Sequence, residues 1–426
     1  MNVSGALRVP GDKSISHRSL ILGALGNGTS RITRILQSAD VHSTAGMLRA
    51  LGVEVPDLSN DFTLRGVGLH GLRKPGSSLD GGNSGTTTRL MAGVLAACPF
   101  DATLIGDASL SRRPMRRVSK PLEGMGARFD LPAHGGLPMT VHGGSLHGIQ
   151  WESEVASAQV KSAILLAALV AGVEAEVIEH EKTRDHTERM LAARGVSIAV
   201  RERVHTTDST AVALVRTDSI ESVDTEVPGD PSSAAFFAAL AALADDGELR
   251  LQDVCVNETR TGFFRQLTMM GTRVREENRR ETGGELVADL IVSPAALHGT
   301  TVTRAYVPAM VDELPMLACM ATRVNGTTEI TGANELRVKE SDRIAAVVSN
   351  LRAIGADAEE LPDGMRITGG RATLRGRVVT EGDHRLAMAF GVLGAAGENA
   401  IEIDDRACVN VSYPGFWDDL ERVCRR

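Results

Sequence analysis

A segment of small polar residues followed by an apolar run of helical length occurs six times along the 426-residue chain. Successive copies begin 71 to 80 residues apart. A fixed period of this kind constrains the fold strongly, because each copy must be one supersecondary unit that packs against its neighbours. The copies are GDKSISHRSLILGAL from Gly11, GNSGTTTRLMAGVLA from Gly82, ASAQVKSAILLAAL from Ala156, GDPSSAAFFAALAAL from Gly229, AMVDELPMLACMA from Ala309 and GDHRLAMAFGVLGAA from Gly382.

A second pattern repeats at nearly the same period. Each of its copies has the pattern of a helix that ends at a glycine, and most continue as a strand. Short alternating runs between the helices, such as SRITRI, ATLIGD and GTTEITG, predict further strands. The unit is therefore two helices with interleaved strands, which predicts an α/β fold of six units. The second-pattern copies are MLRALGVEV, LEGMGARFDL, MLAARGVSIAV, LTMMGTRVREE and LRAIGADAEE.

The first helix of each unit is apolar on almost every side, as in AAFFAALAAL, which predicts that it is buried. Small polar residues at its start are good helix caps. Capping alone does not account for Lys13, Arg18, Arg89 and Arg385 in the same segments, because cations are mildly unfavourable at a helix N-terminus. If the six helices are arranged alike, their N-termini and these cations would together form an anion site.

The segment RVKESDR, residues 337–343, has five charged residues in seven positions. Most charge-dense helical segments simply face water. On a helix, however, Lys339 and Arg343 would stand four apart on one face, where like charges repel each other. Glu340 would lie one position round and would not separate them. We therefore expect a helical segment whose two cations bind an anion.

The composition narrows the class of protein. A hydrophobic content of 42%, a charged content of 23% and a mean hydropathy of −0.04 describe an ordinary soluble globular protein. The length predicts two or three domains. Aromatic residues make up only 3% and the net charge is −8, so we expect neither a base-stacking surface nor a nucleic-acid or membrane partner.

Cysteine usage and apolar runs indicate the compartment. The five cysteines are scattered and form no CxxC pair, which favours free thiols over a disulfide framework or a zinc site. The longest apolar run, around residues 163–173, is too short to span a bilayer. The first residues lack the pattern of a signal or transit peptide. We expect a cytoplasmic protein.

Common signatures of nucleotide, dinucleotide, zinc-protease and serine-hydrolase sites do not occur in the chain. The polar segments instead combine many cations with hydroxyl and amide side chains and three or four carboxylates. That combination suits two small phosphorylated acids that react without a metal. The segments are PGDKSISHR, GNSGTTTR, SLSRRPM, SAQVKS, TRDHTER, DELP, RVKESDR and GDHR.

Taken in order, these segments resemble those of the 5-enolpyruvylshikimate-3-phosphate (EPSP) synthase family. The resemblance extends from Leu7 to Trp417, nearly the whole chain. SAQVKS and TRDHTER resemble the second class of bacterial members, which includes glyphosate-tolerant forms. The motifs that carry the likeness are LDGGNSGTTTRLMAG, RRPM, SAQVKSAIL, TRDHTERM, VDELP, NELRVKESDRI and GDHRLAMAF.

The resemblance implies a two-domain enolpyruvyl transferase fold, an inverse α/β barrel built from six βαβαββ units, three in each domain. The N-terminal domain would be residues 12–228 and serve mainly shikimate 3-phosphate. The C-terminal domain would be residues 1–11 plus 229–426 and serve mainly phosphoenolpyruvate. Chain crossings near 10–12 and 228–230 would form the hinge, with the active site in the cleft.

The resemblance also implies the reaction, which transfers the enolpyruvyl group of phosphoenolpyruvate to the 5-hydroxyl of shikimate 3-phosphate and releases phosphate. This step of chorismate and aromatic amino acid biosynthesis needs a base for the hydroxyl and an acid for the methylene carbon. It also needs cations for the anionic groups of both substrates. We expect these two small molecules as the only partners, no cofactor or metal, and a monomer.

Site residues carry over one by one. In catalysis, Lys13 would touch both substrates and help phosphate leave, Asp312 would be the base at the 5-hydroxyl, and Glu340 would exchange protons at the methylene carbon. Shikimate 3-phosphate would contact Lys13, Ser14, Arg18, Ser157, Ala158, Gln159, Thr183, Arg184, Asp312 and Lys339. Phosphoenolpyruvate would contact Lys13, Asn83, Gly85, Thr86, Arg113, Gln159, Arg343 and Arg385.

Two positions depart from first-class members of the family. Val411 stands where those members have a lysine, and His186 where they have a tyrosine. Second-class members share both changes, but the phosphate contact near the C-terminus is left unassigned.

Two alternatives remain open from the sequence. The related enolpyruvyl transferase that acts on UDP-N-acetylglucosamine would need a reactive cysteine in the N-terminal domain, and Cys98 at the end of an apolar run is poorly placed for that role. A non-catalytic anion-binding protein could keep the cations but would have no need of Asp312 and Glu340.

Overall fold

The computed structural model describes residues 1–203, 209–370 and 372–425. The chain divides into two compact units. We call residues 11–227 with 282–285 the N-terminal unit, and residues 1–10, 228–281 and 286–426 the C-terminal unit. Among the described residues, no helix is both long enough and apolar enough to cross a membrane.

Residues 282–285 make a short excursion into the N-terminal unit that was not expected from the sequence. They form the turn between two strands of the C-terminal unit, β15 (Arg273–Thr282) and β16 (Glu285–Ser293). The turn belongs with the N-terminal unit because the Glu285 carboxylate lies 2.7 Å from Nδ1 of His186. Both side chains are fully buried, so this contact replaces water for each of them.

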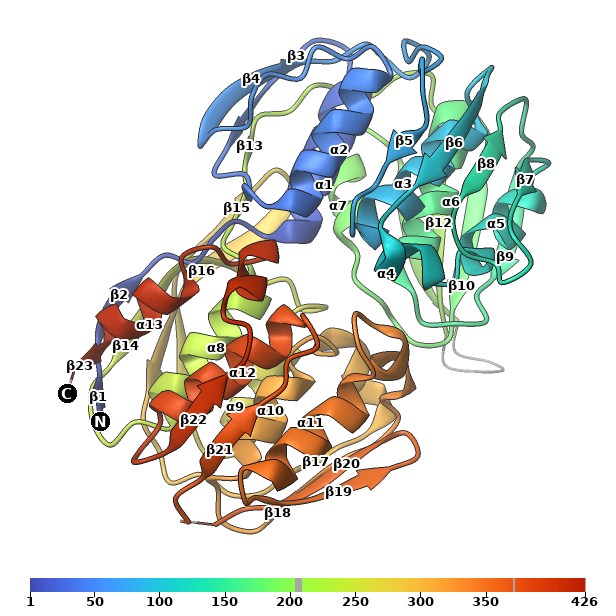
Figure 1. Cartoon of the computed structure of the whole chain (residues 1–426). Coiled ribbons are helices and arrows are strands. Elements are labelled where there is room, and N and C mark those ends of the chain that lie inside the picture. Colours follow the sequence, from blue (N-terminus) through green and yellow to red (C-terminus); the bar gives the residue numbers. More distant parts are fainter. Residues whose placement is uncertain (204–208, 371, 426) are drawn as a thin grey trace. The chain divides into compact units, whose positions relative to one another are not determined.

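Strands of the N-terminal unit form three sheets among the described residues (Figure 1). In each sheet a parallel pair is extended by antiparallel strands, as where β10 runs parallel to β9 and antiparallel to β12. The strand orders are β13 (Thr225–Glu226), β3 (Thr29–Thr33), β4 (Asp61–Arg65); β5 (Leu79–Asp80), β6 (Asp101–Ile105), β8 (Met139–His142), β7 (Arg128–Asp130); and β9 (Ile149–Glu152), β10 (Ala175–Glu179), β12 (Ser209–Leu214), β11 (Ile198–Arg203).

The C-terminal unit repeats this topology. Its two four-stranded sheets have the same order as those of the N-terminal unit, with a parallel pair first and antiparallel strands after it. The orders are β2 (Gly5–Leu7), β14 (Leu249–Cys255), β16, β15; and β17 (Thr301–Val302), β18 (Thr327–Ile330), β20 (Gly364–Thr368), β19 (Asp357–Leu361), beside the pairs β21 (Arg375–Val378) with β22 (Ala400–Ile403) and β1 (Asn2–Val3) with β23 (Cys424–Arg425).

The six apolar runs are all helices, as predicted. Every residue of α8 is buried, which explains why its sequence has no polar side. Five of the six carry a side-chain cap, from Asp12, Ser84, Ser157, Asp230 and Asp383. The helices are α1 (Lys13–Leu25), α3 (Gly85–Ala96), α6 (Ala158–Ala171), α8 (Pro231–Ala242), α10 (Leu314–Ala321) and α12 (His384–Ala395).

The five helices of the second pattern also form, and each is followed by a glycine at positive φ, between 82° and 113°, as predicted. Only glycine adopts that conformation without strain. They are α2 (Ala39–Ala50), α5 (Arg116–Glu123), α7 (His186–Ala192), α9 (Gly262–Met269) and α11 (Arg343–Ala353), with Gly52, Gly126, Gly195, Gly271 and Gly355. The remaining helices are α4 (Ala108–Arg112), α13 (Phe416–Val423), η1 (Arg304–Ala309), η2 (Asn334–Val338) and η3 (Ala407–Val411).

The expectation that residues 337–343 are helical throughout is wrong. The 3₁₀ helix η2 ends at Val338, and Lys339 has an extended backbone. The helix α11 begins only at Arg343, because the side chain of Asp342 accepts a hydrogen bond from the backbone N–H of Ala345 and caps it. Lys339 and Arg343 are therefore not four apart on one helix, and the repulsion inferred from that spacing does not arise.

Candidate active site

Lys13 is the first residue of α1, in the N-terminal unit. Its ammonium group lies 2.5 Å from the carboxylate of Asp40, in the first turn of α2. The lysine side chain is 20% exposed and the aspartate 7%, so the pair is only partly screened by water. This contact fixes a cation at the start of a helix, where the sequence alone gave no partner for it.

Arg18, one turn later, ties three helices together. Its guanidinium donates to the hydroxyl of Thr187 on α7 at 2.7 Å and to that of Ser162 on α6 at 2.8 Å. A third nitrogen donates to the Ser14 carbonyl at 3.0 Å. Burial lowers the pKa of Arg18 to about 10, so the group stays charged at neutral pH. The nearby charge of Arg184 also lowers this pKa.

Arg113 and Asn83 meet beside the N-terminus of α3. The Arg113 guanidinium donates to the side-chain oxygen of Asn83 at 2.7 Å, and the Asn83 amide donates to Asp107 at 2.6 Å. Gly85 is the first residue of α3, and a Cβ there would lie 2.9 Å from Nη1 of Arg89 and 3.5 Å from Nη1 of Arg113. The glycine thus lets two guanidinium groups approach the helix start closely.

Gln159 joins the N-terminus of α6 to that of α3. Its side-chain oxygen accepts from Arg89 at 2.6 Å and its amide donates to the Thr86 hydroxyl at 2.9 Å. Arg89 was singled out in the sequence as a cation without a capping role, but was not predicted as a site residue. Its hydrogen bond to Gln159 orients the side chain of a predicted site residue.

The remaining predicted residues of this unit lie on α6 and before α7. Ser157 caps α6 by accepting from the Val160 N–H, and Ala158 begins that helix. Thr183 is buried and donates to the carboxylate of Glu179. Arg184 follows it in the segment that joins β10 to α7. We call the predicted residues of this unit, together with Arg89, the N-terminal cluster.

His17 lies beside this cluster as a neutral, buried side chain. Its Nδ1 is 2.7 Å from the Thr44 hydroxyl, which in turn is 2.7 Å from that of Thr87. Burial lowers the pKa of His17 to about 3, so it does not exchange protons near neutral pH. A structural hydrogen-bond role accounts for it.

In the C-terminal unit, the two predicted carboxylates and a third, that of Asp383, surround one arginine. Arg343 at the start of α11 is buried and lies 2.8 Å from Asp383, 2.7 Å from Glu340 and 3.3 Å from Asp312. Burial opposes its charge, but Asp383, Glu340 and Asp312 outweigh burial and raise the pKa of Arg343 above its ordinary value. The segment around Arg343 is therefore built on carboxylates and not on paired cations.

Lys339 and Arg385 complete this group. The Lys339 ammonium is 3.9 Å from the Asp312 carboxylate. The backbone N–H of Arg385 donates to the Asp383 side chain at 2.9 Å. Asp383 was not predicted as a site residue, although its position in GDHR marked it as a helix cap. We call Asp312, Lys339, Glu340, Arg343, Asp383 and Arg385 the C-terminal cluster.

Comparison with known sequences identifies relatives along the entire chain. A sequence model of a family described as EPSP synthase (3-phosphoshikimate 1-carboxyvinyltransferase) matches residues 1–420. A 3-phosphoshikimate 1-carboxyvinyltransferase from Sulfurihydrogenibium sp. is 48% identical over 424 residues, 99% of this chain and 98% of the relative. The protein of the same name from Alkalilimnicola ehrlichii is 49% identical and covers 97% of this chain and 91% of its own.

Solved structures agree with the sequence relatives. An EPSP synthase from Acinetobacter baumannii superposes with a TM-score of 0.87 at 40% identity, covering 99% of this chain and 96% of that one. The enolpyruvyl transferase NikO from Streptomyces tendae gives a TM-score of 0.76 at 16% identity, covering 99% and 95%, and bears on the fold alone. The predicted α/β enolpyruvyl transferase fold is confirmed.

Proposed function

Because the chain belongs to the EPSP synthase family, we propose that the N-terminal and C-terminal clusters supply the groups that carry out its reaction. The enzyme transfers the enolpyruvyl group of phosphoenolpyruvate to the 5-hydroxyl of shikimate 3-phosphate and releases phosphate. The observation that carries this conclusion is the family match over residues 1–420, which includes every residue of both clusters. The residue roles below are our proposal.

We assign shikimate 3-phosphate mainly to the N-terminal cluster, so the N-terminal unit would be the domain that mainly binds this substrate. Arg18 would hold the substrate carboxylate, and Arg184 would contact its phosphate. What supports this is that Arg18 is held by the hydroxyl groups of Thr187 and Ser162 and that Arg184 is close enough to lower the pKa of Arg18, so two cations lie near each other. The other proposed contacts are Lys13, Ser14, Ser157, Ala158, Gln159 and Thr183, with Asp312 and Lys339 from the C-terminal cluster.

Phosphoenolpyruvate is assigned to Asn83, Gly85, Thr86, Arg113 and Gln159, with Lys13, Arg343 and Arg385. The hydrogen bonds of Arg113 to Asn83 support this assignment, since they hold a guanidinium beside the exposed N–H groups at the start of α3. A planar guanidinium can bind a phosphate or carboxylate through two parallel hydrogen bonds.

The proton transfers are assigned to the C-terminal cluster. Asp312 would accept the proton of the 5-hydroxyl as that oxygen attacks C2 of phosphoenolpyruvate, while Glu340 would protonate the methylene carbon. In the tetrahedral intermediate, loss of the methyl proton to Glu340 and of phosphate, aided by Lys13, restores the double bond. Arg343 contacts both carboxylates, and we assign it the further task of keeping them aligned.

The alternative substrate UDP-N-acetylglucosamine is disfavoured by the chemistry of Cys98. Cys98 is buried, and burial raises the pKa of its thiol to about 12. Such a thiol is a poor proton donor and a poor nucleophile at neutral pH. No other cysteine of the sequence lies in the N-terminal unit.

Phosphate release from phosphoenolpyruvate tests the reaction directly. We expect release only when shikimate 3-phosphate is present, with one phosphate formed for each enolpyruvyl group transferred. Release that depends on UDP-N-acetylglucosamine instead would contradict the assignment.

We also propose that the enzyme works as a monomer in the cytoplasm, where its five free cysteines would stay reduced. Analytical sedimentation at the working concentration tests the monomeric state.

A further inference from the structure

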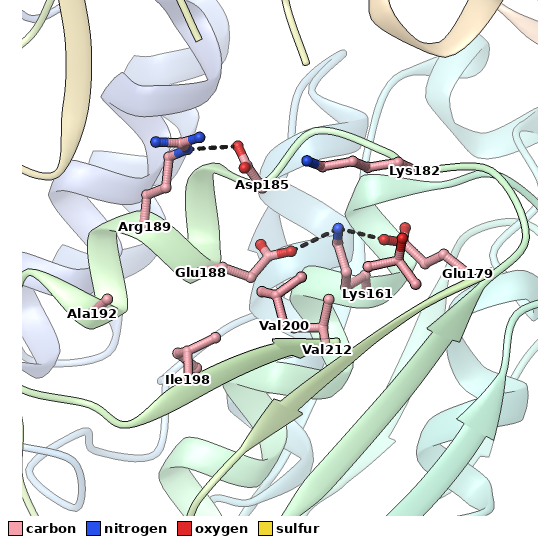
Figure 2. A pocket seen from close by; sticks show the side chains of 11 residues that line it. Lys161, Glu179, Lys182, Asp185, Glu188, Arg189, Ala192, Ile198, Val200 and Val212 are labelled. Atoms are coloured by element: carbon pink, nitrogen blue, oxygen red, sulfur yellow. Dashed lines mark hydrogen bonds and ion pairs between the residues drawn. The ribbon is translucent and has the colours of Figure 1, made fainter. Parts of the chain in front are cut away.

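A pocket of about 300 Å³ opens beside α7 in the N-terminal unit, and none of the described residues that line it is a predicted site residue (Figure 2). Its floor holds three buried charged side chains, Lys161, Glu179 and Glu188. The Lys161 ammonium lies 2.7 Å from Glu179 and 2.6 Å from Glu188, and Figure 2 shows the two carboxylates on either side of it. One cation therefore joins two carboxylates in the interior.

The positive charge of Lys161 stabilises the two buried carboxylates, Glu179 and Glu188. Burial raises the pKa of Glu188, and the charge of Lys161 opposes that rise. The two glutamates also repel each other, since Glu179 raises the pKa of Glu188 further. Without the lysine, two buried carboxylates would face each other with no cation between them, which is strongly unfavourable. The neighbouring pocket gives them room to move apart.

Each glutamate holds a segment that carries proposed substrate contacts. Glu179 accepts a hydrogen bond from Thr183, which precedes Arg184. Glu188 follows Thr187, whose hydroxyl accepts from Arg18 at 2.7 Å and lies 2.7 Å from that of Ser162. Lys161 itself is on α6, and its backbone N–H donates to the carbonyl of Ser157 at 3.2 Å. The three segments meet at one ammonium group.

We propose that Lys161 is a positioning residue for shikimate 3-phosphate, acting through Glu179 and Glu188 to hold Thr183, Arg184 and Arg18 in place. This inference rests on the proposed function of the N-terminal cluster. Lys161 does not touch the substrate in this account. Its removal weakens the binding of shikimate 3-phosphate because the segments that carry the contacts lose their common anchor.

The test is Lys161→Met, which keeps most of the length of the side chain and removes its charge. We expect the KM for shikimate 3-phosphate, and its Kd by calorimetry without phosphoenolpyruvate, to rise about tenfold or more, as for a lost charge-assisted contact. The KM for phosphoenolpyruvate and kcat should change by less than about threefold. Lys161→Arg keeps the charge and should restore most of the affinity.

Two control variants separate positioning from general destabilisation. Lys120→Met makes the same change at an exposed lysine of the same unit and should leave both constants unchanged. Val141→Ala opens a cavity at a fully buried site on β8 and should lower Tm without changing the Kd for shikimate 3-phosphate. If Lys161→Met behaves like Val141→Ala, with a lower Tm and an unchanged Kd, the inference is overturned.

Glu188→Gln decides the question if Lys161→Met does not fold. This variant leaves Lys161 paired with Glu179 but frees α7, and we expect a weaker Kd for shikimate 3-phosphate by about threefold or more, a smaller effect than losing a whole charge-assisted contact. An unchanged Kd overturns the inference. Failure of the proposed function is a different result, in which the wild-type enzyme neither binds shikimate 3-phosphate nor releases phosphate in its presence.

Discussion

The two clusters hold their arginines in opposite ways. In the N-terminal cluster, Arg18 donates to hydroxyl groups, and Arg89 and Arg113 donate to side-chain amide oxygens. In the C-terminal cluster, Arg343 is enclosed by three carboxylates. Under the proposed function, we expect the N-terminal cluster to act mainly in substrate binding, and the carboxylates around Arg343 to carry out proton transfer.

The largest effect is expected from Glu340→Gln, which tests whether proton transfer belongs to the C-terminal cluster. Glutamine keeps the size and much of the hydrogen bonding but cannot shuttle a proton, so kcat should fall by about two to four orders of magnitude. The Kd for shikimate 3-phosphate should stay nearly unchanged. Glu398→Gln, at an exposed glutamate of the same unit, is the control and should keep full turnover. A folded Glu340→Gln enzyme with more than about a tenth of wild-type turnover would end this assignment.

Arg113→Ala tests whether the hydroxyl- and amide-held cations bind substrates. Losing one charge-assisted contact should raise the KM for phosphoenolpyruvate about ten- to hundredfold. The Kd for shikimate 3-phosphate should change little, whereas Gln159→Ala and Arg184→Ala should weaken it. Steady-state kinetics with each substrate varied in turn gives both constants. If Arg113→Ala weakened only the binding of shikimate 3-phosphate, the proposed assignment of the two substrates to their contact residues would have to be reversed.

Asp383→Asn tests how much the ion pair between Arg343 and Asp383 contributes to the stability of the protein. Burial opposes the charge of Asp383, but Arg343 outweighs it and lowers the Asp383 pKa below its ordinary 3.8. A lowered pKa means that the ionised group stabilises the fold above pH 3.8 and that this contribution is lost as pH falls further. The variant should lose about 1.5–3 kcal/mol at pH 7, measured by urea unfolding.

The free energies of unfolding of the wild-type protein and of Asp383→Asn should become similar in acid, because protonated aspartate and asparagine are both uncharged. A stability difference that stayed constant from pH 7 down to about pH 2, well below the ordinary aspartate pKa, would contradict the account. Asp405→Asn provides a matched control, since that aspartate is exposed and its carboxylate accepts hydrogen bonds from the backbone N–H groups of Ala407 and Cys408 in its own turn.

The smallest effect is expected from His17→Asn, which tests whether the histidine beside the N-terminal cluster titrates near neutral pH. His17 has a pKa of about 3 because it is buried, so the pH profile of kcat between about 5 and 8, where histidine ordinarily titrates, should keep its shape. The wild-type free energy of unfolding should fall as pH drops from 6.5 toward 3, since the unfolded histidine binds a proton that the folded one does not. The variant should lose less stability over that window. A profile with an apparent pKa near 6.5 that disappeared in the variant would contradict this.

Much of the fold could be read from the sequence because its signals are local. Apolar runs with small polar residues before them became α1, α3, α6, α8, α10 and α12, and a glycine after each second helix adopted positive φ. Such features depend on neighbours within a few residues. The one local error, at residues 337–343, arose because a charge pattern was followed while Asp342, a capping residue, was overlooked.

The candidate site was less predictable because its contacts join distant parts of the chain. The residues themselves came from a family resemblance, and their roles stay predictions. Arg343 and Asp383 are 40 residues apart, and Arg89 and Gln159 are 70 apart, so no spacing in one sequence pairs them. The signal that could have found Arg89 was present, since it is a cation in a segment where capping requires none.

The turn at residues 282–285 has a consequence for dissecting this protein into pieces. The N-terminal unit is not encoded by one continuous stretch, because residues 282–285 belong to it while the rest of β15 and β16 belongs to the other unit. A fragment ending at residue 227 would lose the carboxylate that meets His186 in the interior. A gene for a self-sufficient N-terminal half would have to supply that turn as a graft, or replace His186 with a residue that needs no acidic neighbour.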